Sequence, residues 1–525
     1  MNRFFSILLA ALMLTPFAAQ ARSPVGPEVE NMDGAALQAA MSEGWLTSAA
    51  ITQAYLDRIR SIDDSGPTLN AVIAVFPDAL EQARSLDAER AAGKVRGPLH
   101  GIPVLIKDNI EVAGPLPTTA GSLALKDNVT GRDAFLVKRL RDAGAVILGK
   151  TNLSEWANIR SGDSTSGWSA VGGLTRNPHD LSRSACGSSS GSGAAVAASL
   201  APLAIGTETD GSIICPAGTN GIVGFKPTVG LVSRTHIVPI SSTQDTAGPM
   251  TLTVADAAAV LTAIAGTDPA DKATAMAREV QQDYVRALRA DALKGRRLGV
   301  MMDRIGGRAD IRALLEAALA TLEAEGAVIV RIADTRSGLG ELGDAEFEIL
   351  LTELKADMAT YLGSLPGAGL PKTLADLIAF NEANPAELKW FGQETFELAE
   401  SKGDLNSEAY LKAKATAARL AGPEGIDKLL KTHNVDVLIG VSNGPSWTMD
   451  LVNGDAFSGP SASQLPAVAG YPHLTVPMGA IHGLPVGISF IGEKWSDAEV
   501  LAVGHRYELA SRKRVVPGYR AGVGP

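Results

Sequence analysis

The chain has 525 residues, a formal net charge of −10 and a hydrophobic content of 46%. A chain of this length and apolar content buries a large core, which excludes an intrinsically disordered protein. The acidic charge balance and the lack of Lys- or Arg-rich runs exclude a nucleic-acid binder and stable electrostatic association with a membrane. We therefore expect a small-molecule or peptide substrate and no obligatory protein partner.

Residues 1–21 have the features of a signal peptide. An arginine near the start precedes an apolar run from Phe4 to Phe17, and a small-residue cleavage site ends at Ala21. The run is shorter than the roughly 20 apolar residues that a membrane-spanning helix needs. We predict cleavage after Ala21 and export of residues 22–525 to the periplasm or the medium; an uncleaved anchor is the alternative.

The numbers of cysteines and histidines limit the chemistry. Cys186 and Cys215 are the two cysteines, too few for a disulfide-rich scaffold or a cysteine-rich zinc site. They are consistent with one disulfide after export or with two small buried thiols. The seven histidines are scattered and form no H-E-x-x-H pair, so no metal and no cofactor are predicted.

Helical and strand patterns alternate along the chain. Apolar residues recur at helical spacing within residues 33–62, with Thr47 or Ser48 as an N-cap for the later part. A short apolar run over residues 103–106 predicts a buried strand that delivers Lys107 at its end. The further predicted elements are helices over 134–143 and 190–199, and strands over 145–148, 203–205, 298–302, 327–332, 435–441 and 486–491.

This alternation predicts an α/β fold, with a large mixed or mainly parallel sheet covered by helices on both faces. Residues 340–430 lack strand patterns and are rich in Ala, Leu, Glu and Lys. We interpret them as a mostly helical insertion, within one domain, that could cap a cleft.

Two segments rich in Gly and Ser lie at residues 186–193 and 206–212. Such runs turn tightly and aim backbone N–H groups and hydroxyls at one point, as an oxyanion site requires. The apolar helix and strand predicted between them argue against a flexible linker. The first segment also fits the G-x-S-x-G nucleophile elbow, with Ser189 as nucleophile, although the preceding residues are turn-like rather than a strand.

Lys107-Asp108-Asn109 and the run from Gly187 to Pro227 resemble the amidase signature family. The resemblance implies Ser212 as the nucleophile, Ser188, 24 residues earlier, as its partner, and Lys107 as the base. It extends over nearly the whole mature chain, with further landmarks at 149–152, 224–227, 245–249 and 483–487.

The resemblance implies a proton relay in which a neutral Lys107 accepts a proton from Ser188, which takes one from Ser212. A lysine is neutral near pH 7 when burial lowers its pKa, as at the end of a buried strand. The tetrahedral oxyanion would be stabilised by the backbone N–H groups of four residues: Thr209, Asp210, Gly211 and Ser212.

Four residues depart from the common pattern of the family: Glu208, Asp210, Ser190 and Ile214. Ile214 stands where many members have an arginine suited to a substrate carboxylate. In these departures the chain is most similar to bacterial peptide amidases, which implies hydrolysis of the C-terminal amide of peptides to free acid and ammonia. The alternatives are a broad aliphatic or aryl amidase with the same triad, the glutamine-hydrolysing A subunit of an amidotransferase, and a catalytically silent binding protein.

Overall fold

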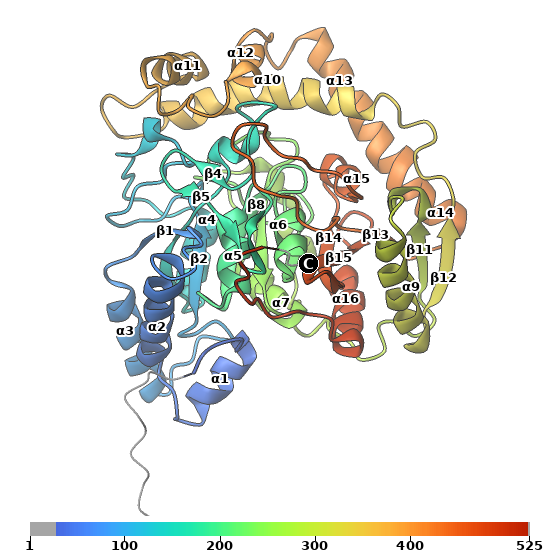
Figure 1. Cartoon of the computed structure of the whole chain (residues 1–525), viewed down its shortest axis with the longest axis horizontal. Helices are drawn as coiled ribbons and strands as arrows, with labels where there is room; N and C mark the ends of the chain where they lie inside the picture. Colours follow the sequence, from blue (N-terminus) through green and yellow to red (C-terminus); the bar gives the residue numbers. More distant parts are fainter. Residues whose placement is uncertain (1–27, 523–525) are drawn as a thin grey trace, which may run out of the picture.

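The computed structural model describes residues 28–522, so the predicted signal peptide lies outside the described residues. The centre of the molecule is a mixed sheet of 11 strands (Figure 1). In order across the sheet the strands are β1 (Val72–Val75), β3 (Val146–Thr151), β2 (Pro103–Lys107), β8 (Leu203–Glu208), β10 (Thr246–Thr251), β9 (Val223–Lys226), β14 (His473–Ile481), β15 (Leu484–Ile491), β13 (Val437–Val441), β11 (Arg297–Met301) and β12 (Val328–Ile332).

Parallel pairing joins β2 to both β3 and β8, and β11 to both β12 and β13. The strands between these two parallel groups pair in antiparallel fashion. The predicted α/β fold with a large mixed sheet is confirmed. The parallel arrangement brings the carboxyl ends of β2 and β8 to the same edge of the sheet.

Helices pack along the sheet. α5 packs against β2, β3 and β8, α6 against β9, β14 and β15, α7 against β10, and α16 against β14. α5 is built from Ser, Gly, Ala and Val and is buried throughout, because its small side chains let it approach the strands closely. The helices outside the 342–433 segment are α1 (Gly34–Ser42), α2 (Ser48–Arg58), α3 (Ala79–Ala91), α4 (Phe135–Asp142), α5 (Ser190–Ala197), α6 (Ile214–Asn220), α7 (Val254–Ile264), α8 (Ala277–Val280), α9 (Ala309–Ala324), α15 (Gln464–Ala469) and α16 (Asp497–Ser511).

The sequence-based strands are present, but several are longer than predicted, and four other strands of the central sheet were missed, as were those of two small two-stranded sheets. The strand predicted over 145–148 continues to Thr151, because the side chain of Lys150 is buried in an ion pair with Asp108. The strand predicted over 203–205 continues to Glu208. The missed strands of the central sheet are β1, β9, β10 and β14. The last three contain glycine or proline, which are depleted in strands and interrupt the hydrophobic pattern.

Between β12 and β13 the chain forms five α-helices, which arc over one side of the molecule in Figure 1. They are α10 (Leu342–Gly363), α11 (Leu374–Ala383), α12 (Glu394–Glu400), α13 (Glu408–Ala421) and α14 (Asp427–His433). No helix within residues 28–522 combines the length and the apolar character needed to cross a membrane.

Aromatic contacts tie these helices to the segment that follows β3. The ring of Phe396 on α12 is fully buried and meets the ring of Trp156 edge-on, with centroids 5.9 Å apart. Phe391, just before α12, meets Trp168 in the same way at 5.2 Å. The 342–433 helices are therefore packed onto the sheet domain through large apolar side chains.

We predict that Phe396→Ala lowers the free energy of unfolding by about 3–5 kcal/mol, because it removes a buried ring and leaves a cavity. Urea denaturation followed by circular dichroism measures the change as a lower midpoint. Leu398→Ala is the matched control, because Leu398 is on the same helix and is 42% exposed. Equal midpoint shifts in the two variants would contradict the prediction.

Candidate active site

Lys107 is the last residue of β2, and its side chain is fully buried. Its Nζ lies 2.8 Å from Ser188 Oγ, 2.8 Å from Thr207 Oγ1 and 3.2 Å from the Thr207 carbonyl oxygen. Asn109 Nδ2 donates to the same Thr207 Oγ1 at 3.0 Å. The structure therefore brings together two of the three residues of the expected proton relay, Lys107 and Ser188.

Burial lowers the pKa of Lys107 to about 7, because the ammonium form loses its hydration inside the protein. The carboxylates of Asp245 and Glu208 raise this pKa, but less than burial lowers it. The neutral amine that a base requires is therefore well populated near neutral pH.

Ser188 and Ser212 lie in neighbouring turns. Ser188 is fully buried just before α5, and its carbonyl oxygen accepts a hydrogen bond from Ser154 N at 3.0 Å. Ser212 lies in the turn from β8 to α6, and its carbonyl oxygen accepts from Ser189 N at 3.1 Å. No hydrogen bond joins the two hydroxyls within residues 28–522, a separation common in enzymes without substrate.

The turn from Thr209 to Ser212 presents its backbone N–H groups without internal partners. Among the hydrogen bonds of residues 28–522, none has the N–H of these four residues as donor. Gly211 has a φ of 75°, which favours glycine, and a Cβ there would lie 3.2 Å from Ser463 Oγ. Unused N–H groups in a rigid turn next to Ser212 are suited to stabilising an oxyanion.

Glu208 fixes the start of α6, directly after Ser212. Its fully buried carboxyl group accepts from Ile213 N at 2.7 Å and from Ile214 N at 3.0 Å. The Glu208 carboxyl group therefore ties the end of β8 to the first turn of α6. Ile214 is 1% exposed, so the position where many members of the family have an arginine is apolar and buried.

A polar network that the sequence analysis missed connects this turn to α10. Gln244 Nε2 donates to the Thr209 carbonyl oxygen at 3.4 Å and to Glu346 Oε1 at 3.0 Å. Burial raises the pKa of Asp210, and the nearby Glu346 carboxylate raises it further. No local motif identifies this network, because Glu346 is far from the turn in sequence and lies in a helix.

A cavity of about 320 Å³ approaches the site from the side of Thr207 and Thr209. It is of a size suited to a small ligand. Lys107, Ser188 and Ser212 are not among its lining residues, so the cavity reaches the catalytic neighbourhood through the residues that contact Lys107. Most lining residues are apolar or carry a hydroxyl; the acidic and basic ones are Asp245, Asp271, Asp357, Arg234 and His236.

Arg234 is already paired with Asp271, with 2.7 Å between Nη2 and Oδ1. Burial lowers the pKa of His236, so this imidazole is neutral at neutral pH. The cavity therefore presents no unpaired arginine to a substrate carboxylate.

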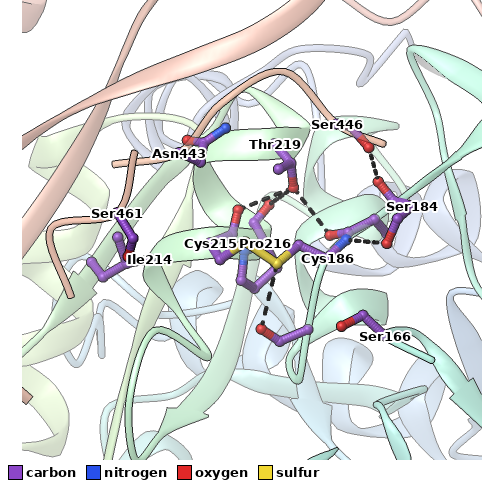
Figure 2. Close-up of a disulfide and its surroundings, with 12 residues drawn as sticks. Ser166, Ser184, Cys186, Ile214, Cys215, Pro216, Thr219, Asn443, Ser446 and Ser461 are labelled. Carbon is purple, nitrogen blue, oxygen red and sulfur yellow. Dashed lines mark hydrogen bonds between the residues drawn. A yellow bond between two sulfur atoms is a disulfide. The ribbon is translucent and has the colours of Figure 1, made fainter. Parts of the chain in front are cut away.

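Cys186 and Cys215 form a disulfide, with their Cα atoms 6.0 Å apart (Figure 2). The sequence allowed either a disulfide or two buried thiols, and the structure has the disulfide.

These features match a known family. A family model described as Amidase matches residues 50–501. The chain belongs to the amidase signature family. It is 50% identical to native peptide amidase from Stenotrophomonas maltophilia, whose structure it matches with a TM-score of 0.90 over 94% of this chain and 99% of that chain.

Two relatives known from sequence widen the comparison. A probable amidase of Arabidopsis thaliana is 39% identical over 92% of this chain and 91% of the relative. The A subunit of the glutamyl-tRNA(Gln) amidotransferase of Thermosynechococcus vestitus is 37% identical over 88% of this chain and 94% of the relative. The chain is thus a serine amidase of this family, a hydrolase that acts on amide C–N bonds.

The alternative of a G-x-S-x-G nucleophile elbow is wrong. Ser189 Oγ donates to the Thr207 carbonyl oxygen at 3.1 Å and is fully buried, so it is not presented at a strand-to-helix elbow. The residues before it, which the sequence analysis took as turn-like, include a strand, β7 (Asp180–Ser184), but this strand belongs to a separate two-stranded sheet.

We predict that kcat/KM for an amide rises with pH through about 7, the pKa of Lys107, because the ammonium form present at lower pH accepts no proton. Ammonia release measured between about pH 5 and pH 9 gives the profile. Lys107→Met lowers kcat/KM by about 10²–10⁴-fold, and its kcat/KM no longer rises with pH through about 7. The exposed Lys94, changed to Met, keeps the wild-type profile, and a wild-type profile that is flat through pH 7 would contradict the role of Lys107.

Proposed function

We propose that this amidase hydrolyses the C-terminal amide of peptides to the free acid and ammonia. The observation that carries the proposal is the 50% identity to a peptide amidase over nearly the whole length of both chains. The pairing of Arg234 with Asp271 and the buried Ile214 also support it, because neither position offers a free cation to a substrate carboxylate. The C-terminal amide of a peptide is uncharged, so it needs no cationic partner in the cavity.

In the proposed reaction, Ser212 Oγ attacks the amide carbonyl carbon and gives its proton to Ser188 Oγ. Ser188 passes its own proton to the neutral Nζ of Lys107, 2.8 Å away. The oxyanion is stabilised by the N–H groups of residues 209–212. The C–N bond then breaks as the proton returns through Ser188 to the leaving nitrogen, ammonia departs, and water hydrolyses the acyl ester by the same relay.

The test compares ammonia release from a short N-acylated peptide amide, from the same peptide as a free acid, and from a simple aliphatic amide. We expect release from the peptide amide, with the internal peptide bonds left intact. Ser212→Ala should lower kcat by about 10⁴-fold or more, because the acyl-enzyme no longer forms.

Ser189→Ala is the matched control, because Ser189 is a neighbouring buried serine outside the proposed relay. We expect it to lower kcat by about tenfold or less, through the loss of its hydrogen bonds to Thr207. Faster turnover of the aliphatic amide would instead favour a broad-specificity amidase. Ser212→Ala protein that retained substantial activity would refute the proposed nucleophile.

We also propose that the protein is exported after cleavage following Ala21. The n-region, apolar run and cleavage site of residues 1–21 support this, as does a disulfide, which persists in oxidising compartments. Expression of the full chain in a bacterial host should give a periplasmic protein whose intact mass corresponds to a chain beginning at Arg22. A cytoplasmic product that retains residues 1–21 would contradict export.

A further inference from the structure

The disulfide lies between the two segments that carry the serines. Cys186 is two residues before Ser188, and Cys215 is three residues after Ser212. The bond closes a loop with a sequence separation of 29, which contains α5 and β8. Figure 2 shows the disulfide, with Pro216 beside Cys215; Cys186 lies just before α5, and Cys215 lies in the first turn of α6. A covalent bond thus joins the two turns close to both hydroxyls.

Most hydrogen bonds near the cysteines stay within one turn. Cys186 N donates to Ser184 Oγ at 3.0 Å, and Cys215 N donates to the Gly211 carbonyl oxygen at 2.8 Å. Other bonds join the two segments: Ser189 N donates to the Ser212 carbonyl oxygen, and two side chains of α6, Thr219 and Asn220, donate to the Ala185 carbonyl oxygen. The disulfide adds to these hydrogen bonds the one covalent cross-link that two cysteines allow.

The backbone of Cys186 has a φ of 56°, in the left-handed region that residues with a Cβ seldom adopt. Such a conformation persists where surrounding structure holds it. The disulfide is one constraint on it, and Ser188, two residues later, must remain 2.8 Å from Lys107 Nζ. A relaxed Cys186 would change the direction in which the chain presents Ser188.

We propose that the Cys186–Cys215 disulfide is a positioning element of the reaction, which holds Ser188 in line between Ser212 and Lys107, so that full turnover requires the oxidised enzyme. The proposal rests on the roles proposed above for the two serines. The enzyme would be fully active in an oxidising compartment and slow under reducing conditions.

Reduction is chemically accessible. Cys186 is 5% exposed, but Cys215 is partly exposed and offers a route for a small thiol. A dithiol reductant supplies two electrons and two protons, breaks the S–S bond into two thiols, and is itself oxidised to a cyclic disulfide. Because the chain has two cysteines in all, every effect of a reductant on a thiol is an effect on this bond.

The test compares the oxidised enzyme, the enzyme held reduced by dithiothreitol, and the double variant Cys186→Ala/Cys215→Ala. We expect kcat to fall by about tenfold or more on reduction, because a small displacement of a relay group is costly. KM should stay within about threefold, since the cavity is not altered. Reoxidation should restore kcat, and the double variant should have a low kcat that dithiothreitol does not change.

Far-UV and near-UV circular dichroism of the reduced enzyme at the assay temperature shows whether a loss of activity occurs in folded protein or results from unfolding. A reduced enzyme that is folded but slow supports the proposal. A reduced enzyme that keeps kcat within about twofold of the oxidised form, or that loses activity by unfolding, overturns it. The measurement on wild type stands even if the double variant does not fold.

A second measurement tests the role of the disulfide without depending on which amide the enzyme hydrolyses. The rate at which a fluorophosphonate probe labels Ser212 depends on the relay and needs no amide. A tenfold slower labelling of the reduced, folded enzyme supports the positioning role even where no peptide amide is hydrolysed, and equal labelling rates overturn it. The absence of ammonia release by oxidised wild type would contradict the proposed function alone.

Discussion

The site depends on one energetic constraint, the burial of Lys107 without a directly paired carboxylate. A charged ammonium in a dry interior loses its hydration, and the lysine avoids this cost by releasing its proton. Thr207 and Asn109 supply neutral hydrogen-bonding groups beside it, whereas Glu208 and Asp245 act on it from a distance. A carboxylate in direct contact would restore the charge and remove the base. The hydroxyl-rich surroundings thus give Lys107 hydrogen-bonding partners that add no negative charge beside it, and its pKa stays near 7.

Strand direction brings these groups together. The parallel strands β2 and β8 both end at the site, so Lys107 meets the Thr207 side chain there. β10 is antiparallel to β8 and begins opposite its end, with Thr246 paired to Glu208. Asp245, just before β10, therefore comes to the same edge, where it accepts from Thr209 Oγ1 at 2.6 Å. Three neighbouring strands in the middle of a covered sheet give the site a rigid base.

Local patterns predicted what depends on local chemistry. The alternation of helical and strand patterns predicted the mixed fold, and the apolar run predicted a strand that ends at Lys107. The three proposed catalytic residues came from the resemblance of the Gly- and Ser-rich turns and of Lys107-Asp108-Asn109 to the amidase signature family. β10 was missed because it contains Gly248 and Pro249, which are uncommon in strands. The structure accommodates the proline because β9 pairs with β10 only at Met250 and Thr251. The link from Gln244 to Glu346 was missed because it joins a loop to a distant helix, and only the tertiary structure brings them together.

The position of the 342–433 helices has a consequence for how such an enzyme can diverge. They leave the sheet after β12 and return at β13, two strands that both pair with β11, so the connection begins and ends beside one strand. Closing a connection costs chain entropy that grows only with the logarithm of its length, by about 0.6 kcal/mol for each doubling. Lengthening this connection therefore costs little chain entropy, whereas loss of a helix such as α12 would also remove buried contacts such as that between Phe396 and Trp156. Differences in length are therefore tolerated more easily between these helices than within β2 and β8, whose pairing keeps Lys107 beside Thr207.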